Sequence, residues 1–310
     1  MGRPFTLAGL RGITNPMPAL RGILPAVPTP FRDDAPSAAL LEGLIAALVP
    51  TGLSGFLVLG SNGEAFSLTD AERGEVLRAA RRAIPKDRFF LAGCGAESTR
   101  VAAERVAQAA GAGADAALVL TPHYLRAHMR PAGFERHFTE LAERAAIPIY
   151  LYNIPQFTGV SLDVEVVARL ARHPKIQGMK DSSGNVTYLT QVVGAAGPDF
   201  ALLAGSDKVL AAALLMGAAG GILALANVAP RECVQLHDLC RAGRWDEAAR
   251  LQARLLPMGT AVTTRFGVPG LKAALALLGR DAGEPRLPLL PLTDPERAEV
   301  AGILRAGGVL

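Results

Sequence analysis

FFLAGCGAESTRVAAERVAQAAGAGADAALVLTP (89–122) has a short apolar run at each end and a longer amphipathic stretch between them. The two runs are apolar at nearly every position, which is typical of strands that are buried on both faces. Between them, residues 98–113 place Val101 and Val106 on one face of a helix and charged side chains on the other. Ser98 precedes this helix as a suitable N-cap. The segment therefore predicts a strand, a crossover helix and a second, parallel strand.

The same alternation repeats along the chain from residue 23. Strands are predicted at 23–31, 55–61, 89–95, 115–122, 147–155, 176–183, 200–207 and 220–228. Eight such units within about 220 residues match an α/β protein that forms a closed (β/α)8 TIM barrel. An open, doubly wound parallel sheet is the alternative that this pattern allows.

The predicted barrel spans residues 22–243 and is flanked by two further segments. Residues 244–310 contain only helical patterns, so we expect a C-terminal helical domain that packs on the barrel or on a neighbouring subunit. Residues 1–21 lack the apolar core of a signal peptide and are expected to form an N-terminal leader. Gly2 and Thr6 in this leader match a myristoylation pattern that arises easily by chance.

The composition argues against several classes of partner. The chain has 32 basic and 28 acidic residues, a formal net charge of +4, and no long run of like charges. A nucleic-acid or membrane-surface binder would concentrate its basic residues in one patch, so neither partner is expected. No apolar run reaches the roughly 18 residues of a membrane span.

The cysteines and histidines indicate neither a disulfide framework nor a metal site. The three cysteines, Cys94, Cys233 and Cys240, lie far apart and form no C-x-x-C pair, and the five histidines show no metal-ligand spacing. We therefore expect a protein without a metal or another cofactor, in the reducing environment of the cytoplasm.

IQGMKDSSGN (176–185) places a lysine, Lys180, at the end of a predicted strand. Lysine is seldom buried, because burial removes the water that stabilises its ammonium group. Side chains alternate along a barrel strand, so Lys180 and Ser182 share the interior face at the C-terminal mouth, where barrel enzymes carry out their chemistry. Tyr152 points inward near the end of the preceding strand by the same argument. This position indicates a nucleophile for carbonyl groups; a lysine that extends its ammonium group to water is the structural alternative.

The loop after the second predicted strand resembles an anion-binding turn. Gly60 and Gly63 allow a tight turn whose free N–H groups can hold a carboxylate, and Ser61 and Asn62 add side-chain donors. Glu64 closes this turn and is expected to hold it together rather than to act as a general base. Asp181, which follows Lys180, is expected to face the helices and to bond backbone groups.

Several short motifs occur in order at the ends of successive predicted strands: GSNGE (60–64), TPHY (121–124), YNIPQFTG (152–159), GMKD (178–181) and ANVAP (226–230). Together they resemble the dihydrodipicolinate synthase and N-acetylneuraminate lyase superfamily over nearly all of residues 22–310. This resemblance implies a class I, Schiff-base aldolase or dehydratase that acts on pyruvate or another small 2-keto acid. It also implies a homotetramer, built as a dimer of dimers, of barrels with C-terminal helical domains.

The resemblance also implies roles for individual residues. Lys180 resembles the Schiff-base lysine of the superfamily, and Tyr152 resembles its proton-shuttling tyrosine. Ser61 resembles a residue of the proton relay and, with Asn62, of the keto-acid carboxylate site. Tyr124 resembles the tyrosine that is lent to a neighbouring subunit's site. The positions that line the pocket in the superfamily correspond here to Ser182, Gly205 and Ile222.

Within the superfamily, the chain most resembles 4-hydroxy-2-oxoglutarate aldolase, through GSNGE (60–64), LAGCGAESTR (91–100) and VTTRFGVPGLK (262–272). The predicted reaction is therefore cleavage of a 4-hydroxy-2-keto acid to pyruvate and an aldehyde. Phe157 stands where dihydrodipicolinate synthases carry an arginine for the second substrate's carboxylate, and a phenyl ring cannot make those bidentate bonds. Asn153, where these aldolases tend to have serine, argues the other way.

Four alternatives remain open from the sequence. The C-terminal stretch RLPLLPLTDPERAEV (286–300) resembles dihydrodipicolinate synthase, which keeps that synthase as one alternative beside a 2-keto-3-deoxy sugar acid aldolase or dehydratase. GCGAES (93–98) partly matches a dinucleotide-binding loop, although Ser98 replaces its third glycine. A barrel that binds a keto acid without turning it over is the non-enzyme alternative.

Overall fold

The computed structural model describes residues 20–310, so the Gly2–Thr6 pattern and almost all of the predicted leader lie outside the described residues. Eight parallel strands form one sheet in the order β1-β10-β9-β8-β7-β6-β5-β4. Their bounds are β1 Gly22–Pro25, β4 Gly55–Val58, β5 Phe89–Gly93, β6 Ala116–Leu120, β7 Ile149–Asn153, β8 Ile176–Asp181, β9 Ala201–Ala204 and β10 Gly220–Leu223. A parallel bridge between Ala26 and Leu57 joins the two ends of this order. The predicted barrel is confirmed, and the open sheet is wrong.

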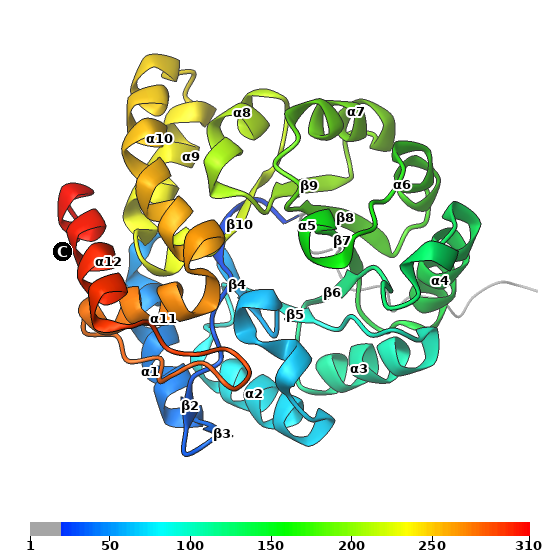
Figure 1. Cartoon of the computed structure of the whole chain (residues 1–310). Helices are drawn as coiled ribbons and strands as arrows, with labels where there is room; N and C mark the ends of the chain where they lie inside the picture. The colour runs from blue at the N-terminus through cyan, green and yellow to red at the C-terminus, as the bar shows by residue number, and fades with distance from the viewer. Residues whose placement is uncertain (1–19) are drawn as a thin grey trace, which may run out of the picture.

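Helices surround the strands on the outside, except the short α5, which lies inside this ring beside β7 and β8 (Figure 1). Their bounds are α1 Ala38–Leu48, α2 Asp70–Ala83, α3 Thr99–Gly111, α4 Pro131–Arg144, α5 Pro155–Thr158, α6 Val164–Leu170, α7 Val186–Ala196, α8 Leu210–Leu215 and α9 Pro230–Arg241. The predicted N-cap of α3 is confirmed, since the Ser98 hydroxyl accepts the Val101 amide at 3.2 Å. Thr69 and Glu72 form a reciprocal capping box at the start of α2.

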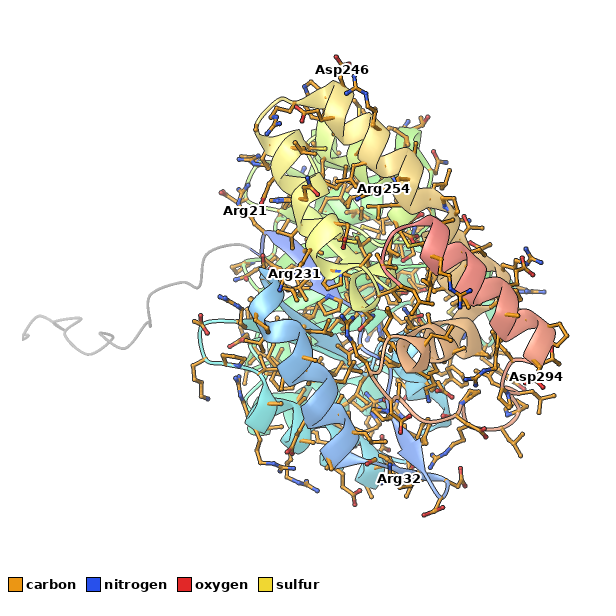
Figure 2. All side chains as sticks on the ribbon, turned by 90° about the vertical axis from the view of Figure 1, so that its left-hand side faces the viewer. Arg21, Arg32, Arg231, Asp246, Arg254 and Asp294 are labelled. Atoms are coloured by element: carbon orange, nitrogen blue, oxygen red, sulfur yellow. The ribbon has the colours of Figure 1, made fainter. Side chains whose placement is uncertain are left out.

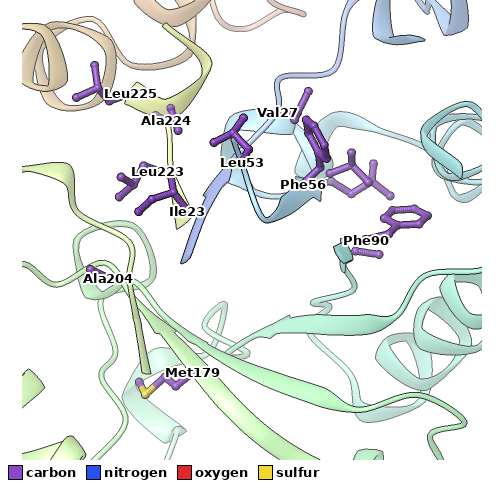
Figure 3. Packing of buried hydrophobic residues seen from close by; sticks show 14 of the residues in the cluster. Ile23, Val27, Leu53, Phe56, Phe90, Met179, Ala204, Leu223, Ala224 and Leu225 are labelled. Atoms are coloured by element: carbon purple, nitrogen blue, oxygen red, sulfur yellow. The ribbon is translucent and has the colours of Figure 1, made fainter. Parts of the chain in front are cut away.

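Each strand separates two layers of apolar side chains. Leu24, Tyr150 and Tyr152 belong to a cluster inside the barrel. Phe56 and Met179 belong to the larger cluster between the strands and the helices, part of which is drawn in Figure 3. Because side chains alternate along a strand, this separation confirms the inward orientation predicted for Tyr152, while Met179 faces the helices.

The C-terminal region consists of α10 (Trp245–Thr260), a π-helical turn (Ala261–Arg265), α11 (Gly267–Leu277) and α12 (Asp294–Ala306). These helices lie beside α1 and α9 (Figure 1), and Figure 2 shows their charged residues, such as Asp246 and Asp294, on the outer surface. Residues 280–293, between α11 and α12, contain no helix. Three prolines within this stretch lack the N–H that a helix requires.

Arg286 fastens this non-helical segment to the barrel. Its guanidinium donates to both carboxylate oxygens of Glu72, at 2.7 and 3.1 Å, and to the Ser67 carbonyl at 3.0 Å. It also bonds Asp34 at 2.9 Å and stacks on the Phe31 ring at 4.5 Å. One side chain therefore joins the C-terminal segment to α2 and to the small hairpin of β2 (Phe31–Arg32) and β3 (Ala35–Pro36).

Among residues 20–310, no helix is both long and apolar enough to cross a bilayer. All three cysteines are free and buried. Burial raises the pKa of the Cys94 thiol to about 12, which makes this side chain a core residue rather than a reactive one.

Replacing Glu72 with Gln should reduce stability at neutral pH but not in acid. Hydrogen bonds from Arg286 lower the pKa of Glu72 from 4.5 to about 2, so the stabilisation is complete above pH 4.5 and is lost as the pH falls through 2. Glutamine keeps the capping box. Urea unfolding should therefore show a loss of about 1 kcal/mol at pH 7 that shrinks towards zero near pH 2. Glu104→Gln, at the exposed Arg100–Glu104 pair, is the matched control. An equal loss at both pH values would contradict the role of the ion pair.

Candidate active site

Lys180 lies on the interior side of β8, near its C-terminal end. It pairs with Tyr152 of β7 in the parallel register, and its side chain is only 4% exposed. The Lys180 Nζ is 3.3 Å from the Tyr152 hydroxyl and 4.4 Å from the centre of the same ring. The predicted burial of this lysine is confirmed, and the alternative of an amine that reaches bulk water is wrong.

Ser61 extends this contact across the barrel mouth. It begins a 3-10 turn, Ser61–Gly63, directly after β4, and its Oγ is 3.4 Å from the Tyr152 hydroxyl. The phenol therefore lies between an amine and an aliphatic hydroxyl, which is an arrangement that can pass a proton along. Asn62 is in the same turn and half-buried.

The glycines of this turn act differently from what the sequence indicates. Gly60 has a φ of −77°. The residues with a left-handed backbone are Leu59, before the turn, at φ 58°, and Glu64, after it, at φ 49°. A side chain on Gly63 would begin 3.4 Å from the Thr29 hydroxyl, which donates to the Gly63 carbonyl at 2.6 Å. Gly63 therefore permits close packing against the segment after β1.

Two further predicted pocket residues, Gly205 and Ile222, lie inside the barrel. A Cβ on Gly205 would lie 2.9 Å from the Lys180 Cε and 2.1 Å from the Ser182 Oγ, so only glycine leaves this space to the lysine chain. Ile222 is fully buried in the interior cluster that contains Tyr152.

Asp181 faces away from the lysine and serves the scaffold. Its carboxylate accepts hydrogen bonds from the Asn153 amide at 2.7 Å and from the Ser183 amide at 3.2 Å. Burial raises the pKa of Asp181, and these hydrogen bonds act against that rise. Asn153 also accepts the Leu162 amide at 3.1 Å, so it joins β7, β8 and the loop before α6. The structural role expected for Asp181 is confirmed, and that of Asn153 was missed from the sequence.

Tyr124 is the predicted site residue that this chain does not bring to Lys180. It follows β6, is 83% exposed and has its backbone amide bound to the Glu97 carboxylate at 2.8 Å. Its place in a neighbouring subunit's site stays a prediction.

A cavity of about 500 Å³ opens beside Ser61 and Tyr152. Its outer wall includes Glu97 and His123, which form an ion pair at 3.0 Å if the imidazole is protonated. The wall also includes Arg73, a fully buried arginine that sequence reasoning missed. Arg73 donates to the Gly93 carbonyl at 2.5 Å and thereby ties α2 to the end of β5.

The glycines of the GCGAES segment are explained by packing. A Cβ on Gly93 would strike the Leu59 carbonyl, and one on Gly95 would lie 2.7 Å from the Leu120 Cβ. Both glycines therefore let neighbouring strands approach, a need that exists without a dinucleotide. Within the described part of the chain, no group of three or more His, Cys, Asp or Glu side chains is arranged to hold a metal ion.

Comparison with known proteins shows to which family this chain belongs. Residues 19–307 match the Dihydrodipicolinate synthetase family. The chain belongs to this family. A relative from Methanothrix thermoacetophila, named 4-hydroxy-tetrahydrodipicolinate synthase, is 37% identical over 92% of this chain and 96% of its own length.

Solved structures of the family share the whole architecture. The YagE prophage protein of E. coli, crystallised in complex with pyruvate, is 32% identical with a TM-score of 0.88 over 94% of this chain and 99% of that one. A monomeric dihydrodipicolinate synthase variant has a TM-score of 0.91 at 28% identity, over 96% of this chain and 99% of that one. The protein is thus a class I carbon–carbon lyase of a family in which pyruvate use and an imine mechanism are typical. The closer resemblance to 4-hydroxy-2-oxoglutarate aldolase stays a prediction.

Replacing Gly205 with Ala should displace the Lys180 side chain. Gly205 has no left-handed backbone, so the substitution acts through close contacts with Lys180, Ser182 and the Asp181 carbonyl, which lies 3.1 Å from the new Cβ. We expect the imine between Lys180 and pyruvate to form, and so to be trapped by borohydride, about 10- to 100-fold more slowly in the variant, since small displacements of reacting groups have effects of this size. Gly194→Ala in α7, where a Cβ meets nothing within 4 Å, is the control and should react at the normal rate. Equal rates in both variants would contradict the steric role of Gly205.

Proposed function

We propose that Lys180 forms an imine with the C2 carbonyl of pyruvate, and that the enzyme then joins C3 of pyruvate to an aldehyde. The first reaction to test is that of 4-hydroxy-tetrahydrodipicolinate synthase, in which the aldehyde is aspartate semialdehyde. The observation that carries the proposal is the buried contact between the Lys180 amine and the Tyr152 hydroxyl at the barrel mouth.

The surroundings of Lys180 support a nucleophilic role. Among residues 20–310, no carboxylate lies within ion-pair distance of its Nζ, so the amine is not held in an ion pair. Attack on the ketone forms a C–N bond, and loss of the oxygen as water gives the iminium ion. This cation withdraws electrons from C3, so a C3 proton can leave to a base and produce an enamine.

Tyr152 and Ser61 support the proton transfers. The phenol lies within reach of both the amine and the Ser61 hydroxyl, and can return to the leaving oxygen a proton taken from the attacking amine. When the enamine attacks the aldehyde, a new C3–C bond forms, and the same relay can protonate the resulting alkoxide.

The Ser61–Gly63 turn is suited to the carboxylate of pyruvate. The amides of Ser61 and Asn62 are the first two of the turn, and they donate none of the backbone hydrogen bonds found between loops and elements in the described chain. Unpaired amides in a tight turn, together with two polar side chains, form a favourable site for an anion.

The relatives support the synthase reaction over the aldolase reaction. Curated relatives that are 34–37% identical over more than nine-tenths of the chain carry the name 4-hydroxy-tetrahydrodipicolinate synthase. A homotetramer in which Tyr124 reaches a neighbouring site belongs to the same proposal, supported by the exposure of that side chain.

One observation favours 4-hydroxy-2-oxoglutarate aldolase as a second candidate. Phe157, in α5, is 68% exposed and has no charged group to offer to a carboxylate. If no other cation takes over this task, aspartate semialdehyde binds without the bidentate contact that an arginine provides.

Lys180→Ala should abolish imine formation. After borohydride reduction with pyruvate, peptide mass mapping should find the adduct on Lys180 of the native protein, and the variant should lose trapping and turnover by more than about 1000-fold. Lys175→Ala is the control, because Lys175 lies just before the same strand and bonds the Ala145 carbonyl. An adduct on another residue, or none at all, would refute the proposal.

Product analysis should distinguish the two candidate reactions. We expect condensation of pyruvate with aspartate semialdehyde and little cleavage of 4-hydroxy-2-oxoglutarate. Phe157→Arg should lower the KM for aspartate semialdehyde about tenfold, since a charge-assisted bidentate contact is worth about 1.5–3 kcal/mol. Phe66→Arg, at another exposed aromatic near the mouth, is the control. Cleavage without condensation would support the aldolase instead.

A further inference from the structure

A buried ion pair lies behind the turn proposed to hold the substrate carboxylate. Glu64 and Lys272 are 0% and 2% exposed, and the carboxylate Oε1 is 2.7 Å from the Nζ. Glu64 directly follows the Ser61–Gly63 turn, whereas Lys272 belongs to α11, more than 200 residues later in the chain. The Glu64 carboxylate is fully buried and is bound by C-terminal groups, so it is not free to bind the substrate itself.

Glu64 also has the backbone conformation that ends the turn. Its φ of 49° and ψ of 34° are left-handed, which a residue with a side chain adopts only at a cost. In this conformation its amide donates to the Ser61 carbonyl at 3.1 Å, while its own carbonyl accepts the Ser67 amide at 2.9 Å. The orientation of Ser61 therefore depends on keeping Glu64 in this unfavourable conformation.

Two C-terminal groups, the Lys272 ammonium and the Arg286 backbone amide, hold the Glu64 side chain. Its second oxygen accepts the Arg286 backbone amide at 2.8 Å. Lys272 in turn donates to the Glu284 carbonyl at 2.9 Å and lies 4.4 Å over the Phe31 ring. Both carboxylate oxygens thus have partners from the C-terminal region, and none from the barrel strands.

We propose that Glu64 and Lys272 are positioning residues, through which α11 and residues 284–286 set the orientation of the carboxylate-binding turn. This inference rests on the proposed function of that turn. A merely stabilising role would be better filled by apolar side chains, because a buried ion pair seldom adds stability over apolar residues of similar volume. What the pair adds is a fixed orientation of the Glu64 side chain, since the carboxylate is held between the Lys272 ammonium and the Arg286 amide.

The consequence is reciprocal coupling. If the C-terminal segment holds the turn in its binding conformation, a carboxylate bound to the turn must in return stabilise the contact between Glu64 and the segment. Pyruvate should therefore slow amide hydrogen exchange in the peptide that contains Arg286.

The test uses a double variant, Glu64→Gln with Lys272→Met, which removes both charges at similar volume and leaves no unpaired buried charge. We expect the KM for pyruvate to rise at least about tenfold, while kcat and borohydride trapping at saturating pyruvate change less than about threefold. A rise in KM alone indicates lost substrate binding rather than lost chemistry. Glu64→Asp keeps the charge but shortens its reach, and should raise the KM in the same direction.

The matched control is Glu299→Gln, which breaks the Arg265–Glu299 pair between the π-helical turn and α12 without touching residues 60–64. It should leave the KM unchanged. A folded double variant with a normal KM would overturn the inference. If neither variant folds, the native protein decides: unchanged hydrogen exchange at the Arg286 peptide on addition of pyruvate would overturn the inference too. Failure of the native protein to trap pyruvate would instead refute the proposed function.

Discussion

The register between β7 and β8 is the constraint on which the site depends. Pairing Tyr152 with Lys180 on adjacent parallel strands places a phenol and an amine side by side at the same height in the barrel. A shift of one residue in either strand would turn one of the two side chains into the helix layer, because orientation alternates along a strand. The outward bond between Asn153 and Asp181, one residue further along both strands, fixes this register from the other side. The same strand pairing therefore sets both the contact of Lys180 with Tyr152 inside the barrel and the bond of Asn153 with Asp181 on its outer side.

Most of the fold and the central pair of the site could be predicted from the sequence. Eight apolar runs separated by amphipathic stretches are a local signal, and alternation within a run follows from strand geometry alone. The alternation of side chains along each strand thus predicted that Lys180 and Tyr152 lie inside the barrel, without knowledge of their neighbours. Residues 280–293, between two C-terminal helices, contain three prolines, and the structure has no helix there.

Other features could not be predicted, because they depend on contacts between distant segments. Glu64 was correctly expected to support its turn, but nothing in the local sequence identifies Lys272 or Arg286 as its partners. The role of Gly63 was attributed to backbone freedom, whereas its φ is ordinary and the constraint is packing, since a Cβ would lie 3.3 Å from the Val27 carbonyl oxygen. Glycine serves both purposes, and only the surrounding atoms distinguish them. The role proposed for Tyr124 depends on a neighbouring chain in the same way.

These long-range contacts give the C-terminal helices a reason to be part of the enzyme. A barrel positions the ends of its strands accurately, but a loop such as residues 60–64 leaves the strand and needs separate support. In this protein the support comes from α11 and the segment around Arg286, whose guanidinium also binds Glu72 at the start of α2. Arg286 thus binds both glutamates: its backbone amide donates to Glu64, and its guanidinium donates to Glu72. The strands carry the proposed nucleophile, and we propose that the C-terminal region orients the groups that hold its substrate.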